Sequence, residues 1–442
     1  MKYTTTDTEL TSIANAIRAK TGTSSSLTYP AGFISAIQNI ETGNARNFIA
    51  SHRTISNYED SQITTIGQGA FAYCSAIRSV SFANCNKIES YAFYNCNSLY
   101  SVYFPNCSII QELAFQSCTA LSYVSFPKCE TIQGSAFVKC QAIKTADFPI
   151  CTIVQSDAFS SCFRMSTANF PELLEIKNYA FYRCESLYTT SFPKCTSIGQ
   201  YAFQYAGTSS TIISFPEVTS VGAYAFKSAY FSEIHLPKVT SIGAQAFASC
   251  MYLTYMNLPS CSVIPPSAFY ACSILSYVHA DICEQIETHA FHYANILEAS
   301  FPSCYFIAAS AFYGCSSLLT INMPACRTIG NEAFVWCSHL TTISMEACSK
   351  IGQTAFANCY DLSRIEFPAC TEIQSTAFYS CINLEIVVLS GSSVVTLTNS
   401  NAFAGTKMSL GGLIFVPESL KATYQSATNW SYYSNCFVKY TG

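Results

Sequence analysis

Charged residues are scarce in this sequence: Asp, Glu, Lys and Arg make up 11% of its 442 residues, and the net charge is −4. The 22 basic residues are scattered along the chain. A nucleic-acid-binding protein gathers such residues on one face, so we expect no nucleic-acid partner. No run of about 18 apolar residues occurs, so no membrane-spanning helix is expected. The first residues also lack the charged start and apolar core of a secretory signal.

Motifs of known catalytic chemistry are missing as well. We find no G-x-S-x-G, phosphate-binding loop, dinucleotide fingerprint or H-E-x-x-H, and no close C-x-x-C pair. We therefore expect neither an enzyme nor a bound cofactor. His235 and His279 are predicted to lie two strands apart, about 10 Å, which is too far for one ion. His289 and His292, in THAFHY, would share a metal only if the chain turned helically there, so no metal site is expected.

The sequence does contain an Ala-Phe pair that recurs at a nearly constant interval. The interval is 22 residues in most cases, with 23, 21, 21 and 25 as exceptions, and Ile or Val stands five residues before the first fifteen Phe. A fixed period of this length indicates a solenoid or related array, in which each unit contacts only its neighbours. The repeated residues are Phe71, Phe93, Phe115, Phe137, Phe159, Phe181, Phe203, Phe226, Phe247, Phe269, Phe291, Phe312, Phe334, Phe356, Phe378 and Phe403.

The 24 cysteines follow the same period. A first position lies three residues after the Phe and a second lies eleven residues further on; Cys436 alone is outside this pattern. Where cysteine is replaced, the residues are small or medium and apolar: Ala206, Ala229, Ala294, Leu173, Val218 and Val239. Because a buried free cysteine behaves as a small hydrophobe, we favour free core thiols in a reducing environment and no disulfide. Disulfides between neighbouring turns and metal ligation are the alternatives.

A short strand is predicted within each unit from the pattern L-x-x-V-x-F-P. In one unit Leu99, Val102 and Phe104 point inward, and Pro105 ends the strand because it has no N–H to donate. The Ile, Ala and Phe of the repeat are expected to line the opposite wall. One unit buries too little apolar surface to offset the entropy of ordering about 22 residues. Neighbouring units must therefore stack, and a ladder of stacked Phe side chains is expected.

This repeat resembles the leucine-rich repeat superfamily, and in particular its BspA-like class. The segments SIGQYAFQYA (197–206), TIGNEAFVWC (328–337) and KIGQTAFANC (350–359) carry the pattern, and the resemblance covers about residues 60–417. It implies a mainly β leucine-rich-repeat solenoid of about 15 or 16 coils, with a parallel sheet on the concave face, that serves as a binding scaffold. The pattern is interrupted at 206–213 and 390–401, where we expect a bulge or loop.

The chain is expected to divide into four segments. They are a helical hairpin (1–42), a linker and entry strand (43–62), the repeats (63–415) and a C-terminal cap (416–442). The string ELTSIANAIRAKTGTSSSLTYPAGFISAI resembles a module of tail and minor structural proteins of phages and prophages of Gram-positive bacteria. The hairpin is thus either an attachment module or a lid on the first coil.

Candidate ligand-binding residues lie between the inward positions of the strands, on the expected concave face. Tyr dominates them together with Ser and Asn, and it provides a rigid amphipathic contact surface. The alternative is that these are ordinary residues of a solvated sheet. The candidates are Tyr100, Tyr103, Tyr123, Tyr188, His235, Tyr255, Asn257, Tyr277 and His279.

Together these features predict a non-enzymatic recognition protein. The first hypothesis is a phage- or prophage-derived tail-associated protein that binds a virion subunit through residues 1–42 and a protein or cell-surface glycan through its concave face. The second is a bacterial BspA-like surface adhesin or intracellular interaction protein, and the third is an unrecognised enzyme. The expected location is a virion or the bacterial cytoplasm, with the cell surface as the alternative.

Overall fold

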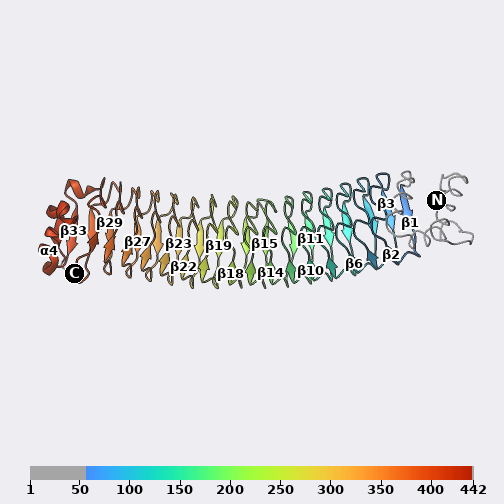
Figure 1. The fold of residues 1–442 in the computed structure, drawn as a ribbon, viewed down its shortest axis with the longest axis horizontal. Helices are drawn as coiled ribbons and strands as arrows, with labels where there is room; N and C mark the ends of the chain where they lie inside the picture. The colour runs from blue at the N-terminus through green and yellow to red at the C-terminus, as the bar shows by residue number, and fades with distance from the viewer. Residues whose placement is uncertain (1–55, 441–442) are drawn as a thin grey trace, which may run out of the picture. The chain divides into compact units, whose positions relative to one another are not determined.

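The computed structural model describes residues 56–440, which divide into two compact units at Cys195 and Thr196. The expected helical hairpin of residues 1–42 lies outside the described residues. Each unit is a parallel β-solenoid, and the chain makes about 17 turns of about 22 residues. Within each unit, Figure 1 shows the odd-numbered and even-numbered strands as two separate rows. No helix among the described residues has the length and apolar character needed to cross a membrane.

Each turn contributes one long strand, of three residues in most turns, and one short strand of two. In the first unit the long strands are β1 (Asn57–Glu59), β3 (Ser79–Ser81), β5 (Ser101–Tyr103), β7 (Tyr123–Ser125), β9 (Thr145–Asp147), β11 (Thr167–Asn169) and β13 (Thr189–Ser191). The short strands there are β2 (Thr65–Ile66), β4 (Lys87–Ile88), β6 (Ile109–Ile110), β8 (Thr131–Ile132), β10 (Ile153–Val154) and β12 (Glu175–Ile176).

The second unit repeats this arrangement. Its long strands are β15 (Ile212–Ser214), β17 (Glu233–His235), β19 (Tyr255–Asn257), β21 (Tyr277–His279), β23 (Glu298–Ser300), β25 (Thr320–Asn322), β27 (Thr342–Ser344), β29 (Arg364–Glu366), β31 (Ile386–Val388) and β33 (Leu413–Val416). Its short strands are β14 (Ser197–Ile198), β16 (Ser220–Val221), β18 (Ser241–Ile242), β20 (Val263–Ile264), β22 (Gln285–Ile286), β24 (Phe306–Ile307), β26 (Thr328–Ile329), β28 (Lys350–Ile351), β30 (Glu372–Ile373) and β32 (Thr396–Leu397).

Strands of successive turns pair in parallel with an offset of one repeat. In the first unit, for example, Ser79 pairs with Ser101 and Ile88 with Ile110. The long strands correspond to the predicted L-x-x-V-x-F segments. The short strands form a second parallel sheet on the opposite wall, where the sequence indicated inward-facing Ile but no strand. Within each unit, most turns therefore bind their neighbours through two ladders of backbone hydrogen bonds; the long-strand ladder is interrupted between β5 and β7 and between β27 and β29, and the short-strand ladder between β18 and β20.

The predicted ladder of stacked Phe side chains is confirmed. In the first unit, Phe115 and Phe137 are fully buried, and their rings are nearly parallel with centroids 5.1 Å apart. A second ladder, at the ends of the long strands, contains Phe126 and Phe148 at 5.5 Å. The Ala before each Phe lies where the turns meet, because the N–H of Phe115 donates to the carbonyl of Ala136 at 2.8 Å.

The turn around every Ala-Phe pair except the last places two residues in the left-handed region, two positions before and two after the Phe. Tyr91 and Asn95, with φ of 61° and 58°, flank Phe93 in this way. Most such positions hold residues other than glycine, including the β-branched Thr354 at 57°. This conformation costs an L-residue about 1–2 kcal/mol, so stacking between turns must offset the local strain.

All 24 cysteines are buried and none forms a disulfide, and thiols at both repeat positions donate to backbone carbonyls. At the first position, Cys96 Sγ donates to the carbonyl of Phe71 in the preceding turn at 2.9 Å. At the second, Cys107 Sγ donates to the carbonyl of Ile109 at 3.3 Å. Burial raises the pKa of Cys107 and of Cys151 to about 12. The cysteines thus fill the core as expected and also satisfy buried carbonyls.

Three of the four turns of altered length have alanine at the first cysteine position, whereas the turn of 25 residues keeps Cys381. Ala206 lies in the turn of 23 residues, and Ala229 and Ala294 lie in the two of 21. The alanine has no thiol that could bond to the preceding turn. In the shortened turns, the backbone N–H of the residue after the alanine makes such a bond; the N–H of Tyr230 donates to the carbonyl of Ala206 at 2.8 Å. The expected loop at 206–213 is present, with Gly207 at a φ of 91°.

The C-terminal segment covers the last turn. After η1 (Lys407–Leu410) and β33 come η2 (Glu418–Leu420), α4 (Lys421–Ser426), η3 (Trp430–Cys436) and β34 (Phe437–Lys439), which pairs with β33. Tyr424 and Trp430 are buried, and both bind the irregular segment 390–401. The Tyr424 hydroxyl accepts from the N–H of Val395 at 3.0 Å, and Trp430 Nε1 donates to the carbonyl of Val395 at 2.7 Å.

Candidate ligand-binding face

The nine candidate residues all lie on one kind of surface, which we call the long-strand face. It consists of the outward side chains at the ends of the long strands and of the residue before each strand. The middle residue of a strand points inward because side chains alternate along it; Val124 and Ile234 are examples, and both are buried. Since the repeat offset is constant, equivalent outward residues form columns across neighbouring turns.

In the first unit, three candidates form a group on two adjacent strands. Tyr100 precedes β5, Tyr103 ends it, and Tyr123 begins β7; their exposed fractions are 51%, 57% and 52%. The two turns are joined where the N–H of Ser122 donates to the carbonyl of Tyr100 at 3.4 Å. Tyr188, also exposed, precedes β13, which is three strands from β7. It therefore lies about 14 Å along the sheet from this group.

In the second unit, the other five candidates gather on β17, β19 and β21. Tyr255 pairs with Tyr277, and Asn257 pairs with His279, in the parallel register. The rings of Tyr255 and His279 are 6.1 Å apart. All five side chains are exposed. Aromatic, amide and imidazole groups thus lie next to one another on three consecutive turns.

The fifth of these residues, His235, is held by a carboxylate of its own strand. His235 Nε2 lies 2.8 Å from Glu233 Oε2, and both side chains are on the long-strand face. Both are well exposed, so solvent weakens the ion pair. The pair nevertheless places a charged group beside the aromatic residues of β19.

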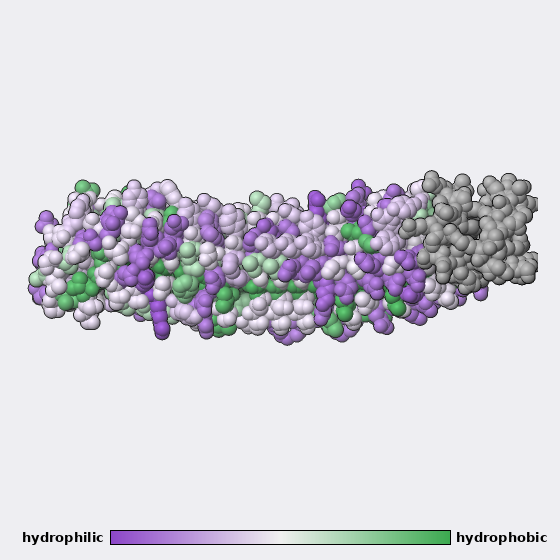
Figure 2. Space-filling model, viewed as in Figure 1, coloured by the Kyte–Doolittle hydropathy of each residue, from purple (hydrophilic) through white to green (hydrophobic). Residues whose placement is uncertain are grey.

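The structure adds apolar residues that the sequence did not identify. Met251, Tyr252 and Ile274 are exposed by 58%, 41% and 42%, and they lie in the turns that lead into β19 and β21. The ring of Tyr252 is 6.1 Å from that of Tyr230 in the preceding turn. We call these four residues, with Tyr255 and Tyr277, the aromatic patch. Figure 2 shows that hydrophobic residues on the visible face form local patches between hydrophilic ones.

The signal for these additional residues was weak. They occupy the two variable positions after the first cysteine, where the core requires no apolar side chain. An apolar residue at a position that the core does not need is the feature that could have identified them. It occurs in successive turns at Tyr230, Met251 and Ile274.

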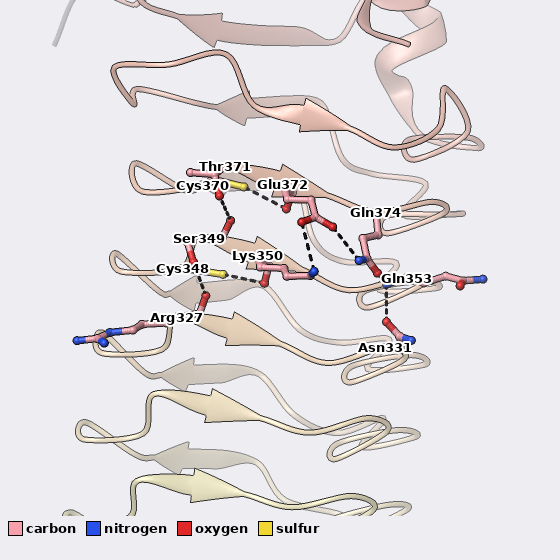
Figure 3. A network of polar contacts seen from close by, with 10 residues as sticks. All are labelled: Arg327, Asn331, Cys348, Ser349, Lys350, Gln353, Cys370, Thr371, Glu372 and Gln374. Atoms are coloured by element: carbon pink, nitrogen blue, oxygen red, sulfur yellow. Dashed lines mark hydrogen bonds and ion pairs between the residues drawn. The ribbon is translucent and has the colours of Figure 1, made fainter. Parts of the chain in front are cut away.

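On the short-strand face, polar side chains bind one another within and between turns. In Figure 3, Lys350 Nζ lies 3.2 Å from Glu372 Oε2 and Gln374 Nε2 donates to Glu372 Oε1 at 2.8 Å. The hydrogen bond from Gln374 and the Lys350 cation lower the pKa of Glu372. Ser349 and Thr371 donate to carbonyls of the preceding turns, both at 3.0 Å. The Lys350–Glu372 pair and the bonds from Ser349 and Thr371 join neighbouring turns.

Within the described turns, neither face offers a metal site with three or more protein ligands. Among residues 56–440, no group of three or more His, Cys, Asp or Glu side chains is placed to hold an ion. Burial raises the pKa of the Cys118 and Cys162 thiols well above the usual value, so they remain protonated and are poor nucleophiles and ligands. The exposed residues instead provide contact area and hydrogen bonds, which suits binding.

The two parallel sheets, the 22-residue turn and the buried Phe ladders define a leucine-rich-repeat β-solenoid. The chain belongs to the family of BspA type leucine-rich repeat regions. The family model, which spans six copies of the repeat, matches residues 46–166, 108–218, 152–276, 196–318 and 305–427. Proteins of this class are generally non-enzymatic scaffolds that bind proteins, and no enzymatic family is indicated for this chain.

One solved structure shares the fold at low sequence identity, and a second is reported as similar. A leucine-rich repeat protein from Bacteroides ovatus is 19% identical with a TM-score of 0.55, and the match covers 87% of this chain and 92% of that one. A leucine rich cell surface protein from Faecalibacterium prausnitzii is 20% identical with a TM-score of 0.31, covering 88% and 92%. No curated protein matches the sequence.

Proposed function

We propose that this protein is a non-enzymatic recognition scaffold whose long-strand face binds a protein ligand. The observation that carries the proposal is the aromatic patch of the second unit, where exposed Met251 and Ile274 lie in the turns that lead into the strands of exposed Tyr255 and Tyr277. Tyr and Met are enriched in protein interfaces, and Tyr is a frequent energetic anchor. The group of Tyr100, Tyr103 and Tyr123 supports a second contact region in the first unit.

A protein ligand fits this surface better than a glycan does. Exposed aliphatic side chains gain little from the hydroxyl groups of a sugar, whereas burying them against a protein is worth about 25 cal/mol per Å². The ion pair of His235 and Glu233 and the polar Asn257 would lie at the edge of such an interface. There they provide specificity more than affinity.

The test is a binding screen with matched variants. Wild type and the double variant Tyr255→Ala/Tyr277→Ala are applied to an array of surface and extracellular-matrix proteins and to a glycan array. We expect protein ligands of the wild type to bind the variant at least tenfold more weakly. Tyr379→Ala, an equally exposed residue outside the patch, is the control. Binding to glycans alone, or unchanged binding by the double variant, would contradict the proposal.

A second candidate function is attachment to a phage or prophage particle through residues 1–42. The feature that favours it is the sequence segment ELTSIANAIRAKTGTSSSLTYPAGFISAI. Under this proposal the protein is located on a virion. If residues 1–42 do not bind a particle, the protein is located on a bacterial surface or in the cytoplasm. Deleting residues 1–42 should abolish copurification with particles while the repeats stay folded by circular dichroism. Full copurification of the deleted form would rule out attachment by this segment.

A further inference from the structure

Two histidines of one turn, His289 and His292, lie side by side in the second unit. Their turn follows β22, and the N–H of His292 donates to the carbonyl of His289 at 3.2 Å. The turn is not helical, because His289 has a φ of 58°. It nevertheless brings the two imidazole rings together, with centroids 4.9 Å apart. The sequence suggested that the two histidines could share an ion only in a helical turn. This non-helical turn also brings their rings close together.

The separation of the rings suits a common metal ion. A metal–nitrogen bond of about 2.1 Å places each imidazole centroid about 3.2 Å from the ion when the ring lies along the bond. For an N–metal–N angle of about 90–110°, the two centroids are then about 4.5–5.2 Å apart. The observed 4.9 Å falls within this interval. The separation of the two rings is thus compatible with a shared ion.

The second observation is a buried nitrogen without a partner. His292 Nδ1 is the one buried side-chain polar atom among the described residues that has no hydrogen bond. Leaving such an atom unsatisfied costs about 1–3 kcal/mol, and a bound ion would remove that cost.

Aromatic rings fix His292 in place. The Tyr313 ring stacks on it with centroids 4.6 Å apart, and the Tyr293 ring meets it edge-on at 4.5 Å.

We propose that His289 and His292 form a two-histidine binding site for a divalent transition-metal ion. Imidazole nitrogen suits Ni²⁺, Cu²⁺ and Zn²⁺ rather than Mg²⁺ or Ca²⁺. The protein supplies two ligands, so water or a group from a bound partner completes the coordination. The site lies on the Ala-Phe turn, apart from the long-strand face, and does not depend on the proposed function.

The test is a titration of the full-length protein with Ni²⁺ by isothermal calorimetry. Ni²⁺ is chosen because Cu²⁺ oxidises thiols. Wild type should bind one Ni²⁺ at this site, and His289→Gln and His292→Gln should each weaken that binding at least tenfold. The control is His339→Gln, since His339 lies elsewhere in the unit with Nδ1 2.7 Å from the carbonyl of Ser316. Its Ni²⁺ affinity should equal that of the wild type.

Two results would overturn the proposal. One is the absence of saturable Ni²⁺ binding in the wild type. The other is equal binding by His289→Gln, whose fold is checked by circular dichroism. If His292→Gln fails to fold, because His292 packs against two Tyr rings, His289→Gln alone decides the question. A failure of this test leaves the binding screen on the aromatic patch unaffected.

Discussion

Raising the pH should destabilise the solenoid, because its core contains thiols that stay protonated only while they are buried. Burial raises the pKa of Cys107 to about 12, compared with about 8.5 for a thiol in the unfolded chain. Above about pH 8.5 the unfolded chain releases the proton and the folded chain keeps it. The folded state then binds more protons, so its stability falls as the pH rises toward 12.

The size of the effect follows from the number of thiols. Each one with such a shift lowers the free energy of unfolding by about 1.4 kcal/mol per pH unit between about pH 8.5 and 12. At pH 9.5, ten neighbouring thiols together would lower it by about 14 kcal/mol, which is comparable to the whole stability of a typical domain. We therefore expect cooperative unfolding near this pH.

The assay is urea unfolding followed by circular dichroism at pH 7.5, 8.5 and 9.5 with a reducing agent present. The test variant carries Cys107→Val, Cys129→Val and Cys151→Val, the substitution that occurs naturally at Val218. Removing three titrating thiols should reduce the loss of stability by about 4 kcal/mol per pH unit. Leu121→Ala, a buried control, should lower stability by about 2–5 kcal/mol at every pH without changing the slope. Equal slopes in wild type and triple variant would refute the reasoning.

Two further predictions concern the backbone. Gly222→Ala should lower the free energy of unfolding by about 1–3 kcal/mol, because the added Cβ would lie 2.7 Å from the carbonyl carbon of Gly199. The control Gly67→Ala has open space around the added Cβ and should lose no stability. Equal melting temperatures of the two variants would contradict this prediction. Thr354→Asn should raise stability by about 1 kcal/mol, because Asn tolerates the positive φ of 57° better than Thr. Thr342→Asn, in the extended β27, should bring no gain, and a lower melting point for Thr354→Asn would show that this strain is absent.

The core could be predicted because each of its positions occurs many times in the sequence. Each inward position recurs in every turn, so a requirement for Ile, Ala, Phe or a small thiol is visible as a column of identical residues. The second sheet was not predicted, since a strand of two residues, such as Thr131–Ile132, has no alternation to detect. The strained turn positions were hidden for a different reason. Tyr91 and Thr354 stand where glycine would have signalled a positive φ.

The candidate site could be predicted only in part. Outward strand positions follow from the alternation around inward residues, so Tyr255 and His279 were placed on one face. Surface residues are not repeated, however, and each has a single occurrence from which to judge it. Met251 and Ile274 therefore carried no periodic signal. The proximity of His289 and His292 depends on a left-handed residue that the sequence pattern does not indicate.

Because the offset between hydrogen-bonded turns is constant, one regular turn can be removed or added without changing the pairing of the others. Excising 22 residues from a regular stretch would leave every remaining donor opposite an equivalent acceptor, whereas the turns of 21 and 23 residues cannot be exchanged in this way. The reach of the protein can therefore be lengthened or shortened in discrete steps while the chemistry displayed on each turn is chosen independently.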